Sequence, residues 1–433
     1  VGSNLYAHVL RGTVKRIVPR VNEAINETWI ADRDRFSYEA IYSKDRLLRP
    51  RIKESGEWRE LDWEEALTAA ADALRDADTG KAGLLASPAV TVEEGHLLSQ
   101  IAEHLDTANI DHRLGRRDIS DQDNDPFFPS LGCRIADIDR QGAILVAGSN
   151  VRAEAPIIAH RLRKAALAGA KVSIANSTRY EYFFDVADYR SGEGLVALLA
   201  GILVAAADGE KLPETVADIC DGIRATEADK RIAASLKDAD DALVMLGNIA
   251  GRHKAYSAVR ALAAGIATLT GASFGGLSEG PNSAGAHLAG VVPHRTEAGE
   301  NCETPGLDVA AIVETPMDVV VLVNVEPDAD IHVIDDAVEK LSKQQFVVAL
   351  TPYVSDALLE CADVLLPTGT FAETSGTYVN IEGEWQSFGG VATPVGESRP
   401  TWKVLRVLGN LIEAPGFEYV TSEDCLLYTS PSP

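Results

Sequence analysis

AILVAGSNVRAEAPIIAHRLRKAALAGAKVSIA, residues 143–175, is the stretch of sequence that decides the fold class. Apolar runs at its two ends, 143–147 and 171–175, flank a segment with helical periodicity. Pro156 stands in the first turn of that helix, where proline is tolerated, and Gly169 ends it. The order strand, loop, helix, strand predicts a βαβ unit, which belongs to a parallel sheet.

The same alternation extends in both directions from this unit. Capping boxes mark two helix starts, Asp62 with Glu65 and Thr91 with Glu94. Continuous apolar strands that alternate with amphipathic helices predict an α/β protein with Rossmann-type parallel-sheet lobes, covered on both faces. Further strands are expected at 83–87, 242–246, 318–324 and 346–350, and further helices near 254–269 and 335–342.

The first 50 residues differ from the rest and predict a small β-rich piece. Residues 5–19 alternate apolar and polar side chains around Gly12-Thr13, which predicts a hairpin. Residues 1–60 hold 12 Lys and Arg against 9 Asp and Glu, whereas the whole chain has a net charge of −25. This positive segment within an acidic protein motivates the expectation of a docking face.

Composition excludes some classes of partner. The chain has 433 residues, of which 46% are hydrophobic. An acidic chain binds nucleic acid or anionic membranes poorly, so we expect no nucleic-acid partner. No apolar run approaches the ~18 residues that a membrane-spanning helix needs, so we expect no direct membrane span.

The cysteines give no local metal motif. They are isolated from one another, without a C-x-x-C or a histidine at metal-binding spacing, at positions 133, 220, 302, 361 and 425. This argues against a zinc site or iron–sulfur cluster built from local sequence. Unpaired, sparse cysteines also favour a reducing compartment.

Both ends lead us to expect a truncated chain. Residue 1 is valine, and methionine occurs only at positions 245 and 317. Residues 425–433 read CLLYTSPSP, which resembles the translation of a sequencing adapter, although a disordered tail is the alternative. We therefore assign residues 425–433 to no domain of the fold.

The loop Gly148, Ser149 and Asn150 is the main candidate for ligand contact. It follows a buried strand and precedes a helix, the place where an open α/β sheet cradles phosphate. However, neither G-x-G-x-x-G nor a P-loop motif occurs, and Glu154 adds a negative charge to the first helical turn. A plain strand–helix turn is the favoured interpretation.

Several charged clusters are further candidate sites. An ion-paired or solvated face is favoured over an anion site for two basic clusters: Arg113, Arg116 and Arg117, and Arg161, Arg163 and Lys164. His160 has no neighbouring nucleophile and receives no role. An acidic turn has the ligand types of a cation site but lacks the glycine and glutamate of a calcium loop, so a solvated turn is favoured for Asp118, Asp121, Asp123 and Asp125.

Two segments carry a resemblance that composition and spacing alone do not give. The late segment contains Glu373–Asn380 (ETSGTYVN) followed by Glu382-Gly383, and it matches E-x-x-G-T-x-x-N-x-E-G, the late signature of the molybdopterin-oxidoreductase fold. The early segment contains Val1-Gly-Ser-Asn4, RIVPR at 16–20 and NETWIAD at 26–32. More narrowly, the chain resembles the family of large iron–sulfur subunits, the G subunits, of bacterial NADH:quinone oxidoreductase (respiratory complex I).

The resemblance implies cofactors outside this stretch of chain. The family's 2Fe-2S and 4Fe-4S ligands lie in an N-terminal region that we expect to be missing. Some members hold an extra 4Fe-4S cluster with cysteines in V-G-C-N and W-I-C-D. Ser3 and Ala31 stand at those positions here, and neither side chain is a thiolate ligand, so we expect that cluster to be absent.

The resemblance also raises the question of molybdenum. Active members of the wider fold bind pterin dinucleotides and hold the metal through Cys, selenocysteine or Ser. Cys133 is the only cysteine in a plausible stretch, and a buried structural thiol is the favoured interpretation. In the complex I subunits the pterin site is regarded as vestigial. We thus expect no molybdopterin, no catalytic residue and no metal ligand, with Gly148, Ser149 and Asn150 as candidates for the vestigial cleft.

The expected domains follow from the pattern and the resemblance together. Residues 1–50 form the β-rich remnant of a 4Fe-4S domain without cluster ligands. One α/β lobe is discontinuous, from 51–135 and 350–415, and the second lobe covers 136–349.

The resemblance implies a structural and docking body that supports electron transfer from NADH to quinone within a proton-translocating enzyme. Its partners would be other peripheral-arm subunits, on the cytoplasmic side of the bacterial inner membrane. Two alternatives are a molybdopterin-dependent oxidoreductase, of the formate dehydrogenase or nitrate reductase kind, and a generic nucleotide-binding module.

Overall fold

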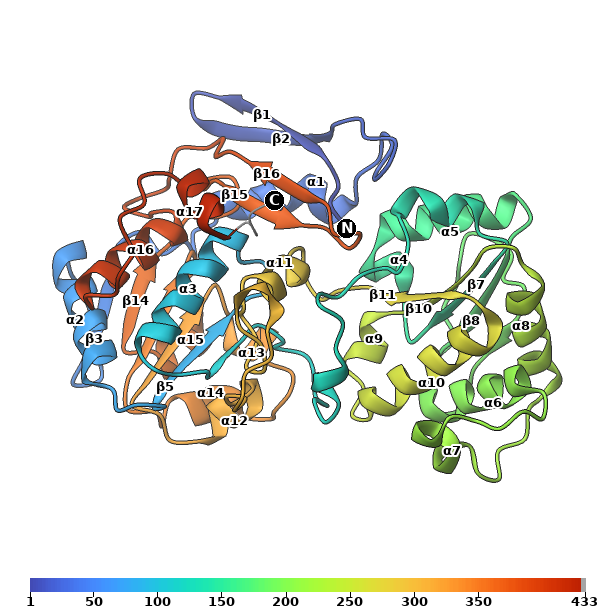
Figure 1. The fold of residues 1–433 in the computed structure, drawn as a ribbon. Coiled ribbons are helices and arrows are strands. Elements are labelled where there is room, and N and C mark those ends of the chain that lie inside the picture. Colours follow the sequence, from blue (N-terminus) through green and yellow to red (C-terminus); the bar gives the residue numbers. More distant parts are fainter. Residues whose placement is uncertain (430–433) are drawn as a thin grey trace.

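A computed structural model describes residues 1–429 and shows two α/β lobes with a small N-terminal piece above their junction (Figure 1). Each lobe is built on its own sheet of mainly parallel strands. The predicted fold class is confirmed, including the β-rich N-terminal piece. Within the described residues no helix is long and apolar enough to span a membrane.

The second lobe contains the βαβ unit of residues 143–175. Its five-stranded sheet is parallel throughout, in the order β11 (Ser273–Gly276), β10 (Ala242–Leu246), β7 (Ala143–Ala147), β8 (Lys171–Ala175) and β9 (Tyr189–Arg190). Its helices are α4 (Val151–Glu154), α5 (Pro156–Leu167), α6 (Leu195–Ala207), α7 (Glu214–Cys220), α8 (Glu227–Asp238), α9 (Asn248–Gly251) and α10 (Tyr256–Thr270).

Both faces of this sheet are buried, which explains the continuous apolar strands. Leu145 points to the face covered by α6, α8 and α10, where it shares a core with Leu199 and Leu262. Ile144 points to the opposite face and packs with Ile158 of α5.

The first lobe has a seven-stranded sheet with two antiparallel strands at one edge. The order is β4 (Glu57–Glu60), β3 (Arg51–Glu54), β14 (Val364–Pro367), β13 (Val347–Thr351), β12 (Val319–Val323), β5 (Ala82–Ala86) and β6 (Ile110–Asp111). One face packs on α2 (Trp63–Asp76), α3 (Val92–His104) and α16 (Thr401–Leu411). The other packs on α12 (Val309–Glu314), α14 (Ala337–Leu341) and α15 (Asp356–Cys361).

The position of β12 differs from the expected division of the chain. It was expected within a second lobe covering 136–349, but it lies between β13 and β5 in the first lobe's sheet. The chain has already returned by α11 (Ser283–Leu288), whose Ala286 packs in the first lobe's core. The two lobes repeat the same local pattern, so hydrophobic periodicity does not tell which sheet a strand joins.

The N-terminal piece contains the predicted hairpin. Strands β1 (Leu5–Leu10) and β2 (Thr13–Pro19) are antiparallel and are followed by α1 (Asp32–Phe36) and a 3-10 helix, Ser37–Tyr42. The turn lies one residue earlier than expected, at Arg11-Gly12, where both residues have positive φ, the geometry of a tight hairpin. A small core joins this piece to residues 372–395 of the late signature region.

The late signature region and the chain end lie beside the first lobe. Strands β15 (Gly376–Val379) and β16 (Trp385–Phe388) form a hairpin below β1 and β2 (Figure 1). The last helix, α17 (Ser422–Thr429), packs on α3 with Cys425 buried. The adapter interpretation of 425–433 stays a prediction, and residues 430–433 lie outside the described residues.

Candidate functional site

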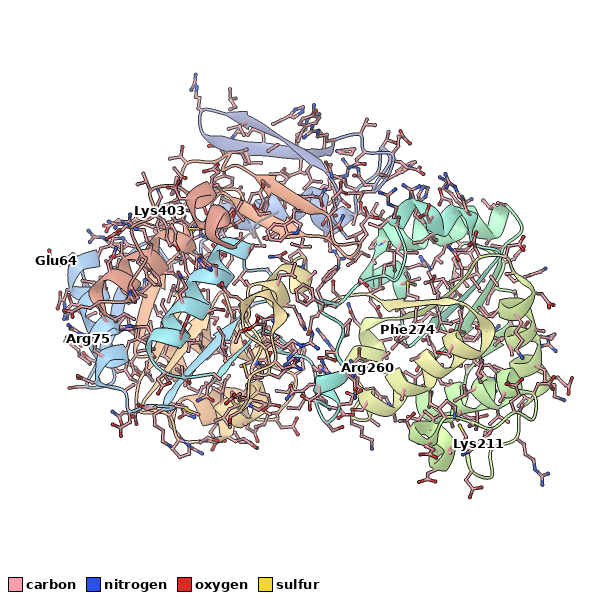
Figure 2. All side chains as sticks on the ribbon, viewed as in Figure 1. Glu64, Arg75, Lys211, Arg260, Phe274 and Lys403 are labelled. Atoms are coloured by element: carbon pink, nitrogen blue, oxygen red, sulfur yellow. The ribbon has the colours of Figure 1, made fainter. Side chains whose placement is uncertain are left out.

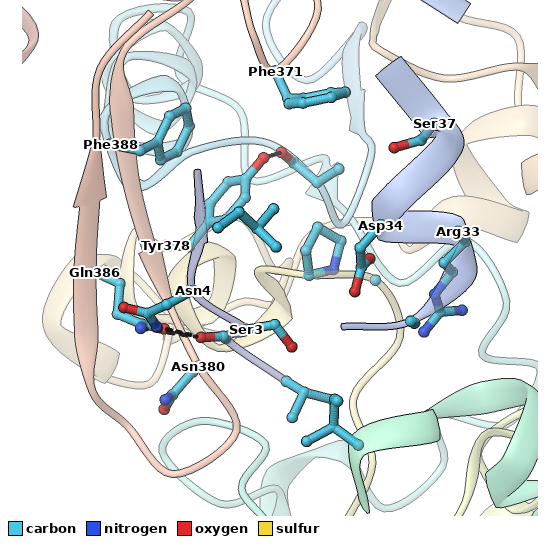
Figure 3. Close-up of a pocket in the computed structure, with 18 of the residues that line it drawn as sticks. Ser3, Asn4, Arg33, Asp34, Ser37, Phe371, Tyr378, Asn380, Gln386 and Phe388 are labelled. Carbon is cyan, nitrogen blue, oxygen red and sulfur yellow. Dashed lines mark hydrogen bonds between the residues drawn. The ribbon is translucent and has the colours of Figure 1, made fainter. Parts of the chain in front are cut away.

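A cavity of about 720 Å³ lies where the N-terminal piece, the β15–β16 hairpin and the two lobes meet. Figure 3 shows its polar lining, with Ser3 and Asn4 entering from the chain start and Arg33 and Asp34 from α1. Tyr378, Asn380 and Gln386 come from the β15–β16 hairpin. The second lobe contributes Glu154 and Asn248, which follow strands β7 and β10. The cavity therefore reaches the carboxyl edge of the second sheet, where α/β proteins bind ligands.

The start of the chain is fixed to the late signature by direct contacts. The Gln386 side-chain amide donates to the carbonyl of Gly2 at 3.1 Å. Gly2 has a φ of +96°, and a Cβ there would lie 2.4 Å from the Gln386 Oε1 atom, so only glycine fits. Asn380 accepts from the backbone N–H groups of Glu382 and Glu384. The signature residues thus shape the cavity wall.

The candidate loop 148–150 is a turn that packs tightly against the loop after β10. Gly148 has a φ of +60°, and a Cβ there would lie 2.8 Å from the backbone nitrogen of Ala250. Ser149 is fully buried. The loop packs directly against the loop after β10, since a Cβ on Gly247 would lie 2.1 Å from the Cβ of Ser149.

The side chain of Glu154 accepts hydrogen bonds from this loop and from the loop after β10. Its carboxylate accepts from the Ser149 hydroxyl and the Asn150 N–H, each at 2.8 Å. It also accepts from the Asn248 N–H at 3.0 Å. The sequence alone marks Glu154 only as an unfavourable charge. Its contact with a residue 94 positions away has no local sequence signal.

The charge balance of the lining does not fit a pterin dinucleotide, although serine, one of the side chains that hold molybdenum in active members of the fold, is present at positions 3, 37, 278 and 387. None of the described residues that line the cavity is a cysteine or histidine, and its charged side chains are Arg20, Arg33, Asp34 and Glu154. Two arginines facing two carboxylates leave no excess of positive charge for pyrophosphate groups. Cys133 does not line the cavity; it packs beside the second lobe's core, where burial raises its pKa to about 12.

Ser3 and Ala31 both line the cavity. The two positions at which the resemblance implies cluster cysteines in some members therefore face the same cavity. Their side chains supply a hydroxyl and a methyl group. Since residues 1–39 contain no cysteine, this stretch offers no thiolate to an iron–sulfur cluster.

The acidic turn and the first basic cluster neutralise each other. Asp125 accepts from Arg116 at 2.5 Å and pairs with Arg260 of α10, which Figure 2 shows at the junction of the lobes. Burial opposes the ionisation of Asp125, but Arg116 and its neighbours hold the pKa below its usual range. Arg260 also pairs with Asp121. The ion-paired interpretation is confirmed for Arg113 and Arg116. Within the turn, Asp121 and Asp125 pair with arginine, Asp118 accepts from Ser120 and Ser257, and Asp123 is exposed to solvent as predicted.

The second basic cluster ties α5 to the N-terminal piece. Arg161 donates to Glu27 at 2.9 Å and to Asp139 at 2.8 Å, and Lys164 pairs with the same two carboxylates. His160 also contacts Glu27, at 3.2 Å. Arg163 donates to the carbonyl of Phe183, and Arg117 donates to that of His332. Among the described residues, no group of three or more His, Cys, Asp or Glu could hold a metal ion.

Comparison with known proteins gives two family matches. Residues 46–411 match the molybdopterin oxidoreductase family. Residues 1–39 match the 4Fe-4S domain of proteins like NADH-ubiquinone oxidoreductase NDSU1/NuoG. Together the matches cover the N-terminal piece and both lobes.

Individual relatives agree with these matches. The G subunit of NADH-quinone oxidoreductase from Streptomyces coelicolor is 29% identical, over 89% of this chain and 48% of its own length. The mitochondrial NADH-ubiquinone oxidoreductase 78 kDa subunit of Candida albicans is 25% identical, over 96% of this chain and 51% of its own length. The chain thus spans about half the length of the relatives it matches.

A solved structure shares the fold. Acetylene hydratase from Pelobacter acetylenicus superposes with a TM-score of 0.69 at 14% identity, covering 98% of this chain and 70% of that one.

Proposed function

Because the chain belongs to the molybdopterin oxidoreductase family and is similar to the G subunits of NADH-quinone oxidoreductase, we propose that it is the structural and docking body of the large iron–sulfur subunit of such a complex. In this role it supports electron transfer from NADH to quinone without a catalytic centre of its own. The observation that carries the proposal is a cavity whose lining contains no cysteine and no excess of positive charge for the pyrophosphates of a pterin dinucleotide.

The N-terminal piece provides a surface suited to docking. Its hairpin and the loop after it expose apolar side chains, with Leu10 61% exposed and Trp29 57% exposed. Arg11, Lys15 and Arg16 add positive charge to the same hairpin. Exposed apolar side chains with charged residues nearby in the same element are typical of protein interfaces. We assign the two ends of this hairpin, with Leu10 at its turn and Trp29 in the loop after β2, to contact with other peripheral-arm subunits, whose clusters would complete the electron path.

The cellular placement follows from this assembly. As part of a respiratory complex, the chain would lie peripherally on the cytoplasmic side of the bacterial inner membrane. Membrane attachment and proton translocation would then belong to other subunits.

The alternative function is a molybdopterin-dependent oxidoreductase. The family match and the structural likeness to acetylene hydratase favour it at the level of fold. Fold alone does not assign activity. The cavity lacks a thiolate, and the Glu154 carboxylate lies beside the loop after β7, so the site chemistry favours the docking body over the enzyme.

Association measurements test the proposal. The variants Leu10→Glu and Trp29→Glu would be compared with Leu167→Glu, a matched control at a site 68% exposed on the second lobe. We expect the first two to weaken binding to purified peripheral-arm subunits about tenfold or more, because each places a charge in an apolar interface. The control would bind normally. Equal binding by all three variants would contradict the proposed surface.

A further inference from the structure

We infer that Glu154 is a built-in occupant of the anion site at the carboxyl edge of the second lobe's sheet, and that it closes this part of the cavity to phosphate-bearing ligands. The inference concerns the cavity and does not depend on the docking role. It rests on where Glu154 lies, on what donates to it, and on how its surroundings are packed.

The position is the topological switch point of the sheet. Strand β7 lies between β8 on one side and β10 on the other. Helix α5 covers one face of the sheet and α10 the other, so the chain leaves β7 and β10 in opposite directions. Open α/β sheets bind the phosphates of nucleotides in the crevice that forms at this point.

The donors at this point converge on a single carboxylate. The Ser149 hydroxyl and the Asn150 N–H come from the loop after β7, and the Asn248 N–H comes from the loop after β10. Backbone N–H groups that converge from two loops in this way form an anion cradle. Here the anion is a side chain of the same protein, at 2.8 to 3.0 Å from all three donors.

The surroundings hold the carboxylate in place. Arg33 of α1 donates to the main-chain carbonyl of Glu154 at 2.5 Å, which fixes the backbone of Glu154 to the N-terminal piece. The close packing of Gly148 on Ala250 and of Gly247 on Ser149 holds the two loops against each other, so their donors stay directed at one point. A phosphate would have to displace Glu154 and meet its negative charge, which is costly in a partly buried site.

Replacement of Glu154 tests the inference. In the 433-residue chain, Glu154→Ala leaves three donors without an acceptor, and inorganic pyrophosphate can then supply the missing oxygens. We expect pyrophosphate to bind Glu154→Ala about tenfold or more tightly than the wild type, the effect of at least one charge-assisted hydrogen bond. Calorimetric titration measures the affinity, and thermal denaturation with and without pyrophosphate gives a second readout.

The matched control is Glu382→Ala. The Glu382 carboxylate accepts a backbone N–H from Ile135 at 2.6 Å and does not line the cavity. Its removal leaves a single orphaned donor, and we expect no gain in pyrophosphate binding. Glu154→Gln gives an intermediate case, because the amide keeps one acceptor oxygen and loses the charge. We expect it to bind pyrophosphate more weakly than Glu154→Ala.

Three outcomes would overturn the inference. Pyrophosphate could bind the wild type as tightly as Glu154→Ala, which would mean that the cradle is already open. Glu154→Ala could bind no better than Glu382→Ala.

Where Glu154→Ala folds poorly, acetate supplies the missing carboxylate and is expected to raise its refolding yield but not that of the control. If neither acetate nor pyrophosphate raised the refolding yield of Glu154→Ala, the inference would also be contradicted.

Discussion

Asn176 and Ser149 hydrogen bond to each other in both directions. The backbone N–H of Ser149 donates to the Asn176 Oδ1 atom at 2.8 Å, and the Asn176 side-chain amide donates to the carbonyl of Ser149 at 2.8 Å. Both residues are buried. The pair fixes the loop after β7 to the end of β8, so the donors that face Glu154 are held by the neighbouring strand.

Substitution of Asn176 should therefore destabilise the loop after β7. Asn176→Ala removes both partners of buried backbone groups, and we expect the free energy of unfolding to fall by about 2–4 kcal/mol. Asn176→Asp keeps the acceptor but loses the donor and brings a charge near Glu154, so we expect a loss at least as large. Urea denaturation measures both. A loss below about 0.5 kcal/mol, the range of neutral surface changes, would contradict this role for the pair.

A buried ion pair links the late signature to the first lobe. Arg46 contacts Glu373 at 2.9 Å, and the two side chains are 1% and 0% exposed. Arg46→Met would leave the Glu373 charge buried and unpaired, so we expect a loss of about 3–5 kcal/mol. The double variant Arg46→Met with Glu373→Gln should lose less than the sum of the single variants. Strict additivity in this double-mutant cycle would show that the pair is not coupled.

His294 should make stability depend on pH. Its side chain is buried, and burial, followed by the charge of Arg113, lowers its pKa from 6.5 to about 4. The folded state keeps the ring neutral, whereas the unfolded chain takes up a proton below its ordinary pKa. Stability is therefore lost as the pH falls from about 6.5 toward 4, by up to about 1.4 kcal/mol per pH unit.

Replacement of His294 isolates this contribution from other buried groups. Glu94 works in the opposite direction, because burial raises its pKa to about 7 and its protonated form favours the folded state at lower pH. Neither ring nitrogen of His294 hydrogen bonds to a protein atom, so His294→Leu should fold. Between pH 7 and pH 5 the free energy of unfolding of His294→Leu should fall by about 2 kcal/mol less than that of the wild type. Parallel pH profiles for the two proteins would contradict the account.

Local patterns in the sequence predicted the elements closely. The apolar runs at 143–147, 171–175 and 242–246 became β7, β8 and β10 with the expected bounds. Thr91 and Glu94 form the complete predicted capping box. Asp62 caps its helix as expected, but the Glu65 side chain turns to Arg59 instead of closing a capping box. These signals lie within a few residues of the element they specify, so one sequence reveals them.

What the sequence did not reveal depends on contacts between distant segments. The place of β12 beside β5 requires knowledge of which lobe it joins. The role of Glu154 depends on Asn248, which reaches it only because β7 and β10 are neighbours. The pairing of Arg260 with Asp121 and Asp125 likewise joins two distant segments. Periodicity and spacing carry no information on such pairings.

The most direct test of the central claim is pterin and metal analysis of the chain purified from a host that makes molybdenum cofactor. The account expects a folded protein without molybdenum, tungsten or pterin fluorescence, because the cavity has no thiolate among its lining residues and Glu154 fills its anion cradle. Molybdenum and pterin in stoichiometric amounts would contradict the account, and would make the cavity beside Ser3 and Glu154 the active site of an oxidoreductase.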